Sequence, residues 1–211
     1  MAFDFKKAYK PLYQPGREPT LIEVPGMNYV AIEGRGDPND PAGEYARALA
    51  VLYAVSYAIK MSKMGTRRIE GYFDYVVPPL EGFWWQDGVD GMDCARKADF
   101  RWISAIRLPE FVKRADFDWA VGEAFRKKGL DCQGAKMLTI EEGLCAQVMH
   151  IGPYDDEPAT LADLHAFIEK SGCAEDFTPA RRHHEIYLAD PRRTAPERLK
   201  TVIRLPVRRD A

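Results

Sequence analysis

The tetrapeptide Ile-Arg-Leu-Pro occurs twice in this chain, at residues 106–109 and 203–206, and constrains the fold more than any other feature. Each copy closes the same expected succession of strand, turn, strand, glycine-containing loop, helix, strand and strand. Identical residues at the same place in the same order of elements indicate an internal duplication. We therefore predict an α+β fold, in which duplicated strand-helix-strand-strand modules with antiparallel sheets surround a central ligand groove.

The chain is expected to form one domain, 1–211, with internal repeats at about 19–109 and 136–208. A connecting helix is expected near 116–128, with Asp116 as its N-cap and Gly129 as its C-terminal stop. The first repeat should contain strands at 21–24, 29–32, 68–77 and 100–108 and a helix at 42–61. The second should contain strands at 137–141, 144–150, 182–188 and 199–207 and a helix at 160–171.

Composition excludes several classes of function. Of the 211 residues, 46% are hydrophobic, which is enough for a core without metals or disulfides. The net charge of −2 lacks the basic excess of a nucleic-acid surface. The longest apolar run, 46–59, is too short and interrupted to span a bilayer, and the N-terminus lacks the apolar segment of a signal peptide. Four dispersed cysteines suggest free thiols in a reducing cytoplasm: Cys94, Cys132, Cys145 and Cys173.

Alternation along the strand at 182–188 places His183, Glu185 and Tyr187 on one face. If Ile186 and Leu188 pack under a helix, the first three side chains face the groove. A carboxylate in such an apolar setting suits a general base, because partial burial raises its proton affinity. We therefore predict Glu185 and Tyr187 as catalytic residues and His183 as a ligand-binding residue.

The same alternation in the first repeat places Glu81, Phe83 and Trp85 on one face. With Trp102 on a neighbouring strand and Tyr154 at the groove rim, they are predicted to bind ligand. Carboxylates among aromatic rings suit planar, apolar and often cationic molecules. The alternative is that both glutamates are exposed strand residues paired with nearby arginines: Arg68, Arg181 and Arg182.

No metal or cofactor is expected. The adjacent rings of His183 and His184 point to opposite faces of a strand, and no third ligand follows at a suitable spacing. The chain also lacks the P-loop, the Gly-x-Ser-x-Gly motif and the dinucleotide-binding Gly-x-Gly-x-x-Gly motif. The expected partner is a small molecule, with no nucleic acid and no membrane, and the oligomeric state stays open.

Four segments resemble the stand-alone GyrI-like proteins. The tail at 182–207 is the most specific, and shorter likenesses lie at 6–13, 79–85 and 100–111. The resemblance implies paired strand-helix-strand-strand modules with a ligand groove. The same fold serves as the effector-binding domain of some multidrug-sensing transcription regulators, in which a glutamate followed two residues later by a tyrosine contacts cationic drugs. Glu185 and Tyr187 match that pattern, although this chain has no appended helix-turn-helix.

Two functions are open at this stage. Some stand-alone members hydrolyse the strained cyclopropane of DNA-alkylating natural products, so the resemblance favours a detoxifying hydrolase that adds water to a cyclopropanoid ring. Glu185 would then orient or deprotonate the water, and Tyr187 or a nearby histidine would bind the carbonyl oxygen. The alternative is a module that senses or sequesters small molecules without turnover. Gyrase inhibition, suggested only by the family name, has no support among these residues.

Overall fold

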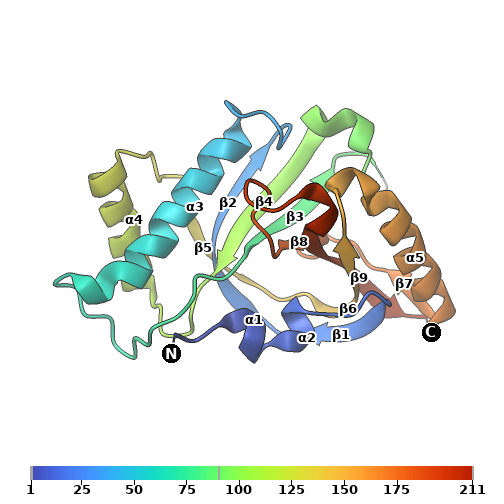
Figure 1. Ribbon diagram of the computed structural model, residues 1–211, viewed down its shortest axis with the longest axis horizontal. Helices are drawn as coiled ribbons and strands as arrows, with labels where there is room; N and C mark the ends of the chain where they lie inside the picture. The colour runs from blue at the N-terminus through green and yellow to red at the C-terminus, as the bar shows by residue number, and fades with distance from the viewer. Residues whose placement is uncertain (1, 90, 211) are drawn as a thin grey trace. The chain divides into compact units, whose positions relative to one another are not determined.

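The computed structural model describes residues 2–89 and 91–210 of the chain (Figure 1). It is an α+β fold whose strands pair antiparallel, as predicted. Two compact units can be distinguished. The first contains the residues up to Phe5, Met27–Pro78 and Trp84–Ile140, and the second contains Lys6–Gly26, Pro79–Phe83 and the chain from Glu141 onward.

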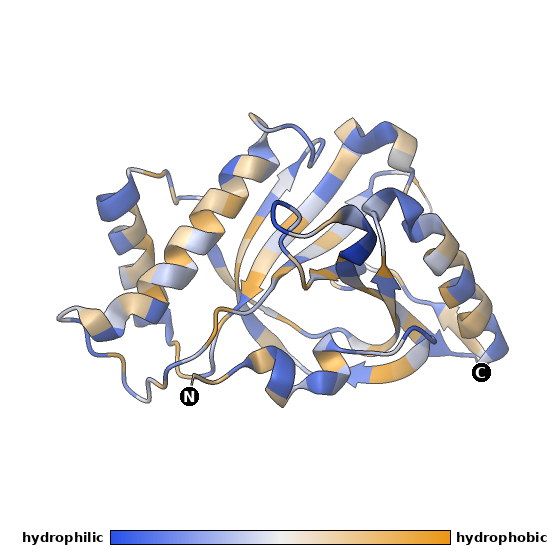
Figure 2. Ribbon diagram, viewed as in Figure 1, coloured by the Kyte–Doolittle hydropathy of each residue, from blue (hydrophilic) through white to orange (hydrophobic). Residues whose placement is uncertain are grey.

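The second unit is a sheet with one long helix. Strand β9 pairs with β6, β8 and β7, and β6 also pairs with β1. Helix α5 lies along β6 and β7 and is amphipathic, with apolar residues alternating with polar ones (Figure 2). The elements are α2 (Lys10–Tyr13), β1 (Thr20–Val24), β6 (Gly143–Ile151), η3 (Tyr154–Asp156), α5 (Glu157–Lys170), β7 (Cys173–Glu175), β8 (His183–Tyr187), η4 (Pro196–Arg198) and β9 (Lys200–Arg209).

The core of the second unit forms where α5 meets the inner faces of β6 and β9. Its buried members are small and branched apolar residues: Ala146, Val148, Leu164, Ile168, Cys173, Ile203, Leu205 and Val207. Cross-strand partners point to the same face of a sheet. Val148 pairs with Ile203, so these two residues identify the face that α5 covers.

In the first unit, β2 pairs with β4 and β5, and α3 packs against β2, β4 and α4. The short helix α1 (Phe5–Ala8) and strand β3 (Leu80–Gln86) each contribute residues to both units. The remaining elements are β2 (Met27–Arg35), α3 (Glu44–Lys60), η1 (Met61–Met64), η2 (Cys94–Asp99), β4 (Phe100–Arg107), α4 (Arg114–Lys128) and β5 (Lys136–Ile140).

The first strand of each sequence repeat lies in the unit built mainly from the other repeat. Strand β1 pairs with β6, whereas the next strand, β2, pairs with β4 and β5. The turns at residues 25–26 and 141–142 therefore connect strands that do not pair with each other. The spatial units consequently differ from the sequence repeats at their first strands.

Two local predictions are wrong. Residues 68–77 form no strand beyond a single bridge at Tyr75. The left-handed φ of 74° at Gly71 interrupts an extended path, and the aromatic residues that follow pack against Phe111 instead. In α4, Lys113 is the N-cap, and Asp116 lies three residues later, where it accepts the backbone N–H of Lys113 at 3.3 Å.

The C-terminal stop predicted for α4 is confirmed, because Gly129 ends this helix with φ 65°. The thiols of Cys132, Cys145 and Cys173 are free and buried. Within the described ranges, no helix combines the length and apolar character needed to cross a membrane.

Candidate functional site

Helix α5 lies on the side of the sheet to which Glu185 of β8 points, contrary to the arrangement assumed from the sequence. Glu185 pairs with Ile203 and Tyr187 with Thr201 on β9, so these residues continue the face buried under α5. A helix had been expected beneath Ile186 instead. The consequence is chemical, because the start of α5 now brings its own side chains to Glu185.

Three side chains from one strand face form the hydrogen-bonded part of the site. His183 Nε2 lies 3.0 Å from Glu185 Oε1, and the hydroxyl of Tyr187 donates to Glu185 Oε2 at 2.7 Å. A carboxylate only accepts, so His183 Nε2 is the donor. The ring of Tyr154, in η3, meets that of Tyr187 edge to face at 5.8 Å between centroids. The structure thus brings together four of the predicted site residues.

Sequence reasoning missed Glu157, the first residue of α5. Only 8% of its surface is exposed, and among the described residues its Oε1 has no hydrogen-bond partner. Burial, the charge of Glu185 and the charge of Asp155 raise its pKa from 4.5 to about 9. At neutral pH Glu157 is therefore protonated. The available signal was its position on the same helical face as Leu161, Leu164 and Ile168, where a carboxylate is out of place.

The site carries a negative electrostatic field. Burial and the charges of Glu157, Glu185 and Asp190 raise the pKa of Tyr154 to about 12. Its hydroxyl therefore keeps its proton throughout the physiological range and is available as a hydrogen-bond donor. A carboxylate beside tyrosine rings favours ligands with positive charge or transition states that develop it.

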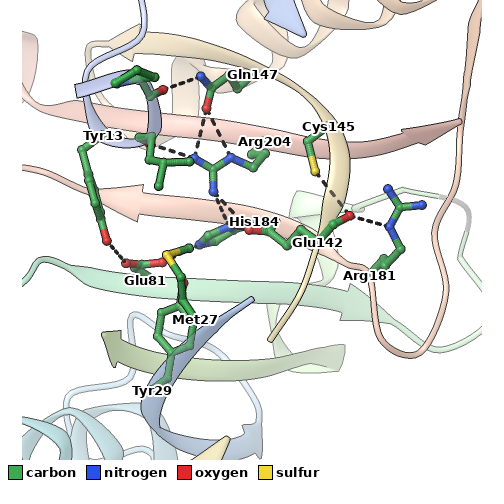
Figure 3. Close-up of polar contacts among 12 residues, drawn as sticks. Tyr13, Met27, Tyr29, Glu81, Glu142, Cys145, Gln147, Arg181, His184 and Arg204 are labelled. Atoms are coloured by element: carbon green, nitrogen blue, oxygen red, sulfur yellow. Dashed lines mark hydrogen bonds and ion pairs between the residues drawn. The ribbon is translucent and has the colours of Figure 1, made fainter. Parts of the chain in front are cut away.

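Glu81 and Phe83 belong to a different cluster, because both contact His184, which points to the opposite face of β8 from Glu185. Figure 3 shows Glu81 beside His184. Glu81 Oε2 lies 3.0 Å from His184 Nε2, and Phe83 stacks on the His184 ring at 4.0 Å. Glu81 is 1% exposed and also accepts from the hydroxyl of Tyr13. The structure therefore does not bring Glu81 and Glu185 into one site, and Glu81 is no exposed strand residue.

Glu142 and Arg204 complete this buried cluster. Both oxygens of Glu142 lie 3.0 Å from His184 Nδ1, and Arg204 Nη1 donates to Glu142 Oε2 at 3.1 Å. Arg204 also donates to the carbonyl of Leu12 and to Gln147 Oε1. We call Glu81, Glu142, His184 and Arg204 the buried quartet. It joins β3, the β5–β6 turn, β8 and β9 to the N-terminal segment.

Charge balance explains how four ionisable groups share a dry interior. Burial would lower the pKa of His184, but the charges and hydrogen bonds of Glu142 and Glu81 outweigh it and raise that pKa. Burial would raise the pKa of Glu142, but His184 and Arg204 outweigh it and lower that pKa to about 2. The raised pKa of His184 favours the imidazolium, whose two ring N–H groups lie against Glu142 and Glu81.

The two predicted tryptophans lie in the first unit. Trp102 is fully buried and meets Tyr45 edge to face at 5.1 Å, so it belongs to the core of that unit. Trp85 is half-buried. Of the arginines considered as partners of the glutamates, Arg181 binds Asp176 and backbone carbonyls, and Arg68 binds backbone carbonyls.

In the part of the chain described, no group of three or more histidines, cysteines and carboxylates is placed to hold a metal. Two histidines already have defined roles: His150 binds Thr160 and a backbone carbonyl, and His184 lies within the quartet beside a guanidinium. We therefore expect ligand binding and any turnover to withstand dialysis against a chelator, measured on untagged protein. Loss of function restored by one equivalent of zinc would contradict this.

The chain combines antiparallel α+β units with a buried glutamate and two tyrosines beside the start of one helix. This chain belongs to the GyrI-like family, whose small-molecule-binding domain matches residues 17–208. It is 45% identical to a hydrolase from Listeria innocua, with a TM-score of 0.88 over 98% of this chain and 100% of that one.

Two further comparisons agree. An uncharacterized conserved protein from Listeria innocua is 46% identical, with a TM-score of 0.92 over 98% of this chain and 100% of that chain. The C-terminal domain of EcmrR is 12% identical, with a TM-score of 0.54 over 91% of this chain and 98% of that one, which shows the fold alone. No curated protein matches the chain significantly.

Proposed function

We propose that this protein is a hydrolase that adds water to a strained, electrophilic cyclopropane in a planar small molecule. The observation that carries the proposal is the pair of carboxyl groups at one site. Glu157 is buried and protonated at neutral pH, whereas Glu185 accepts two hydrogen bonds. A buried, protonated carboxyl group beside a second carboxyl group that accepts two hydrogen bonds is suited to supply an acid and a base.

Each residue then has a defined role. Glu185 accepts the proton of the attacking water, and the hydrogen bonds from His183 and Tyr187 fix its orientation. Glu157 donates its proton to the carbonyl oxygen that is conjugated to the ring. The rings of Tyr154 and Tyr187 supply aromatic surface for a flat substrate.

The reaction balances with water alone. The water oxygen forms a bond to a ring carbon while one ring C–C bond breaks. The electron pair of that bond moves to the conjugated carbonyl, whose oxygen takes the proton of Glu157. Glu185 holds the proton removed from water, and proton exchange between the two carboxyl groups restores the starting state. Because the ring is already strained, positioning and charge stabilisation are the main demands on the protein.

The Listeria innocua relative described as a hydrolase supports an enzymatic function. Tyr187 follows Glu185 by two residues, the pattern that the family resemblance associates with binding of cationic drugs. Binding without turnover is therefore the second candidate, and the negative field at Tyr154 favours it for cations. One variant distinguishes the two.

Replacing Glu185 with glutamine should lower the rate of turnover of a cyclopropane-bearing alkylator by about 10²–10⁴-fold, with little change in ligand affinity. The amide keeps the shape of the carboxylate but cannot accept the proton. Product formation is followed by chromatography, and affinity by calorimetry with a non-reactive planar analogue. Glu169→Gln, on the exposed side of α5, is the control and should behave as wild type.

Wild-type protein that binds the alkylator stoichiometrically and leaves it intact would contradict the hydrolase proposal. Two other results would contradict the role of Glu185 as the base. One is a Glu185→Gln variant that loses affinity for cations but not for neutral planar ligands, since Glu185 would then be only a charge partner. The other is unchanged turnover in the variant.

A further inference from the structure

His150, on β6, joins the two ends of the segment that carries Tyr154 and Glu157. Its Nδ1 lies 2.8 Å from Thr160 Oγ1 on α5, and its Nε2 lies 3.0 Å from the carbonyl oxygen of Pro153. A carbonyl only accepts, so Nε2 carries a hydrogen and donates it to Pro153, while Nδ1 shares a hydrogen bond with the threonine hydroxyl. With 4% of its surface exposed, the ring is held inside the unit.

Gly152 lets the chain pass directly over that ring. Its φ is 146°, a backbone conformation that residues with a side chain rarely adopt. A Cβ at this position would lie 3.4 Å from His150 Nε2. The segment 152–160 is therefore fixed at its start by close approach to the ring, at Pro153 by a hydrogen bond, and at Thr160 by a second one.

The strand register aligns this anchor with the site. His150 pairs with Thr201 on β9, which pairs with Tyr187 on β8, so the three share one row across one face of the sheet. Glu157 starts α5 above this row. The groups that face it are Glu185 from β8, Thr201 from β9, and Asp155 and Tyr154 from η3.

We propose that His150 is a positioning residue that holds the carboxyl of Glu157 in its buried place against Glu185. Both ring nitrogens are occupied by the segment itself, so His150 acts through the backbone and through α5 rather than on substrate. Without it, the first turn of α5 can move so that the Glu157 carboxyl reaches water. The inference rests on the proposed function, in which Glu157 is the acid.

The experiment measures the titration of Glu157 directly, by carbon-detected NMR of its side-chain carboxyl, assigned by comparison with the Glu157→Gln spectrum. His150→Gln keeps a donor for Pro153 but loses the Thr160 contact, and Thr160→Val removes the same contact from the other side. We expect both variants to lower the pKa of Glu157 by about one to three pH units from its wild-type value near 9. The alkaline limit of turnover should move by the same amount.

His165→Gln is the matched control. That histidine lies on α5, is largely exposed and contacts Glu175, so its loss should leave the Glu157 titration unchanged. An equal shift in the control would mean that the titration reports general loosening of α5 and would overturn the inference.

The outcomes separate the inference from the function on which it rests. A wild-type Glu157 that titrates near pH 9, with variants that titrate at the same pH, overturns the role of His150 and leaves the proposed function intact. A wild-type Glu157 that titrates near its ordinary value removes the acid itself, and with it both proposals. If His150→Gln does not fold, Thr160→Val and Gly152→Ala provide the same measurement with the imidazole in place.

Discussion

The Glu157→Gln variant is expected to turn over substrate about 10²–10⁴-fold more slowly than the wild type, and to be more stable. Glutamine fits the volume of a protonated glutamate but has no acidic proton to transfer. It also cannot ionise. The wild-type side chain must be kept protonated at a pH far above its ordinary value of 4.5, which destabilises the fold. The structure thus predicts opposite effects of one substitution on activity and stability.

The stability effect has a defined pH dependence. The folded pKa of Glu157 is raised, so its contribution to stability is fully present below 4.5 and is lost as the pH rises through about 9. At pH 7, which lies 2.5 pH units above the ordinary value of 4.5, this corresponds to about 3 kcal/mol at 1.36 kcal/mol per pH unit. Urea unfolding of the variant and wild type at pH 4, 7 and 9 measures it. The curves should coincide at pH 4 and separate progressively above it.

Glu169→Gln again serves as the control, because an exposed glutamate on the same helix should shift neither curve. The assignment of Glu157 as a buried acid would be wrong if wild type and the Glu157→Gln variant had the same pH dependence of stability. Equal turnover in the two proteins would contradict its role as proton donor, whatever the stability.

Breaking the buried quartet should have the largest effect on stability in the second unit. Glu142→Gln leaves His184 and Arg204 facing only Glu81 in a site that is almost completely buried. Removing one partner of a buried ion pair costs about 3–5 kcal/mol, because the remaining charge has neither water nor a counterion. Asp118→Asn, which breaks the exposed Arg114–Asp118 pair, is the control and should change stability by less than about 0.5 kcal/mol.

The pKa shifts within the quartet also predict the pH range in which it stabilises the fold. The raised pKa of His184 means that its contribution is complete below the ordinary value of 6.5 and is lost as the pH rises through the folded value. The pKa of Glu142, lowered to about 2, means that its contribution is complete above 4.5 and is lost as the pH falls towards 2. The two together place the greatest stabilisation between about pH 4.5 and 6.5.

A double-mutant cycle tests whether the quartet acts as a unit. Glu142→Gln combined with His184→Gln removes one charge of each sign, so the double variant should be more stable than the sum of the single losses by about 1–3 kcal/mol. Additive losses would show that the two groups do not depend on each other. A stability difference between wild type and Glu142→Gln that stays constant from pH 3 to 9 would contradict the ionisation states assigned here.

Several parts of the structure follow from the sequence. Alternation along one strand correctly placed His183, Glu185 and Tyr187 on one side, because consecutive side chains of a strand must point to opposite faces. The helices followed from apolar periodicity and from stop signals such as Gly129. The repeated Ile-Arg-Leu-Pro predicted an internal duplication, but it did not predict that its arginines are buried. Arg107 is 6% exposed and Arg204 is fully buried, each beside a glutamate.

Tertiary structure determines which residues meet at the site and so give it its chemistry. Local spacing cannot show that the first turn of α5 lies over β8, because that depends on which face of the sheet the helix covers. The sequence pattern was compatible with either face, and the choice determined whether Glu185 met Glu157 or solvent. The same holds for Glu142, which is 62 residues from Arg204.

Protonation states depend on tertiary structure for the same reason. By itself, the sequence established the family, the class of fold and one strand face with a glutamate between a histidine and a tyrosine. Whether a given carboxyl is an acid, a base or half of an ion pair depends on burial and on the charges within a few ångströms. Those quantities exist only after distant segments have packed together, which is why Glu81, Glu157 and Glu185 differ although the chain presents them alike.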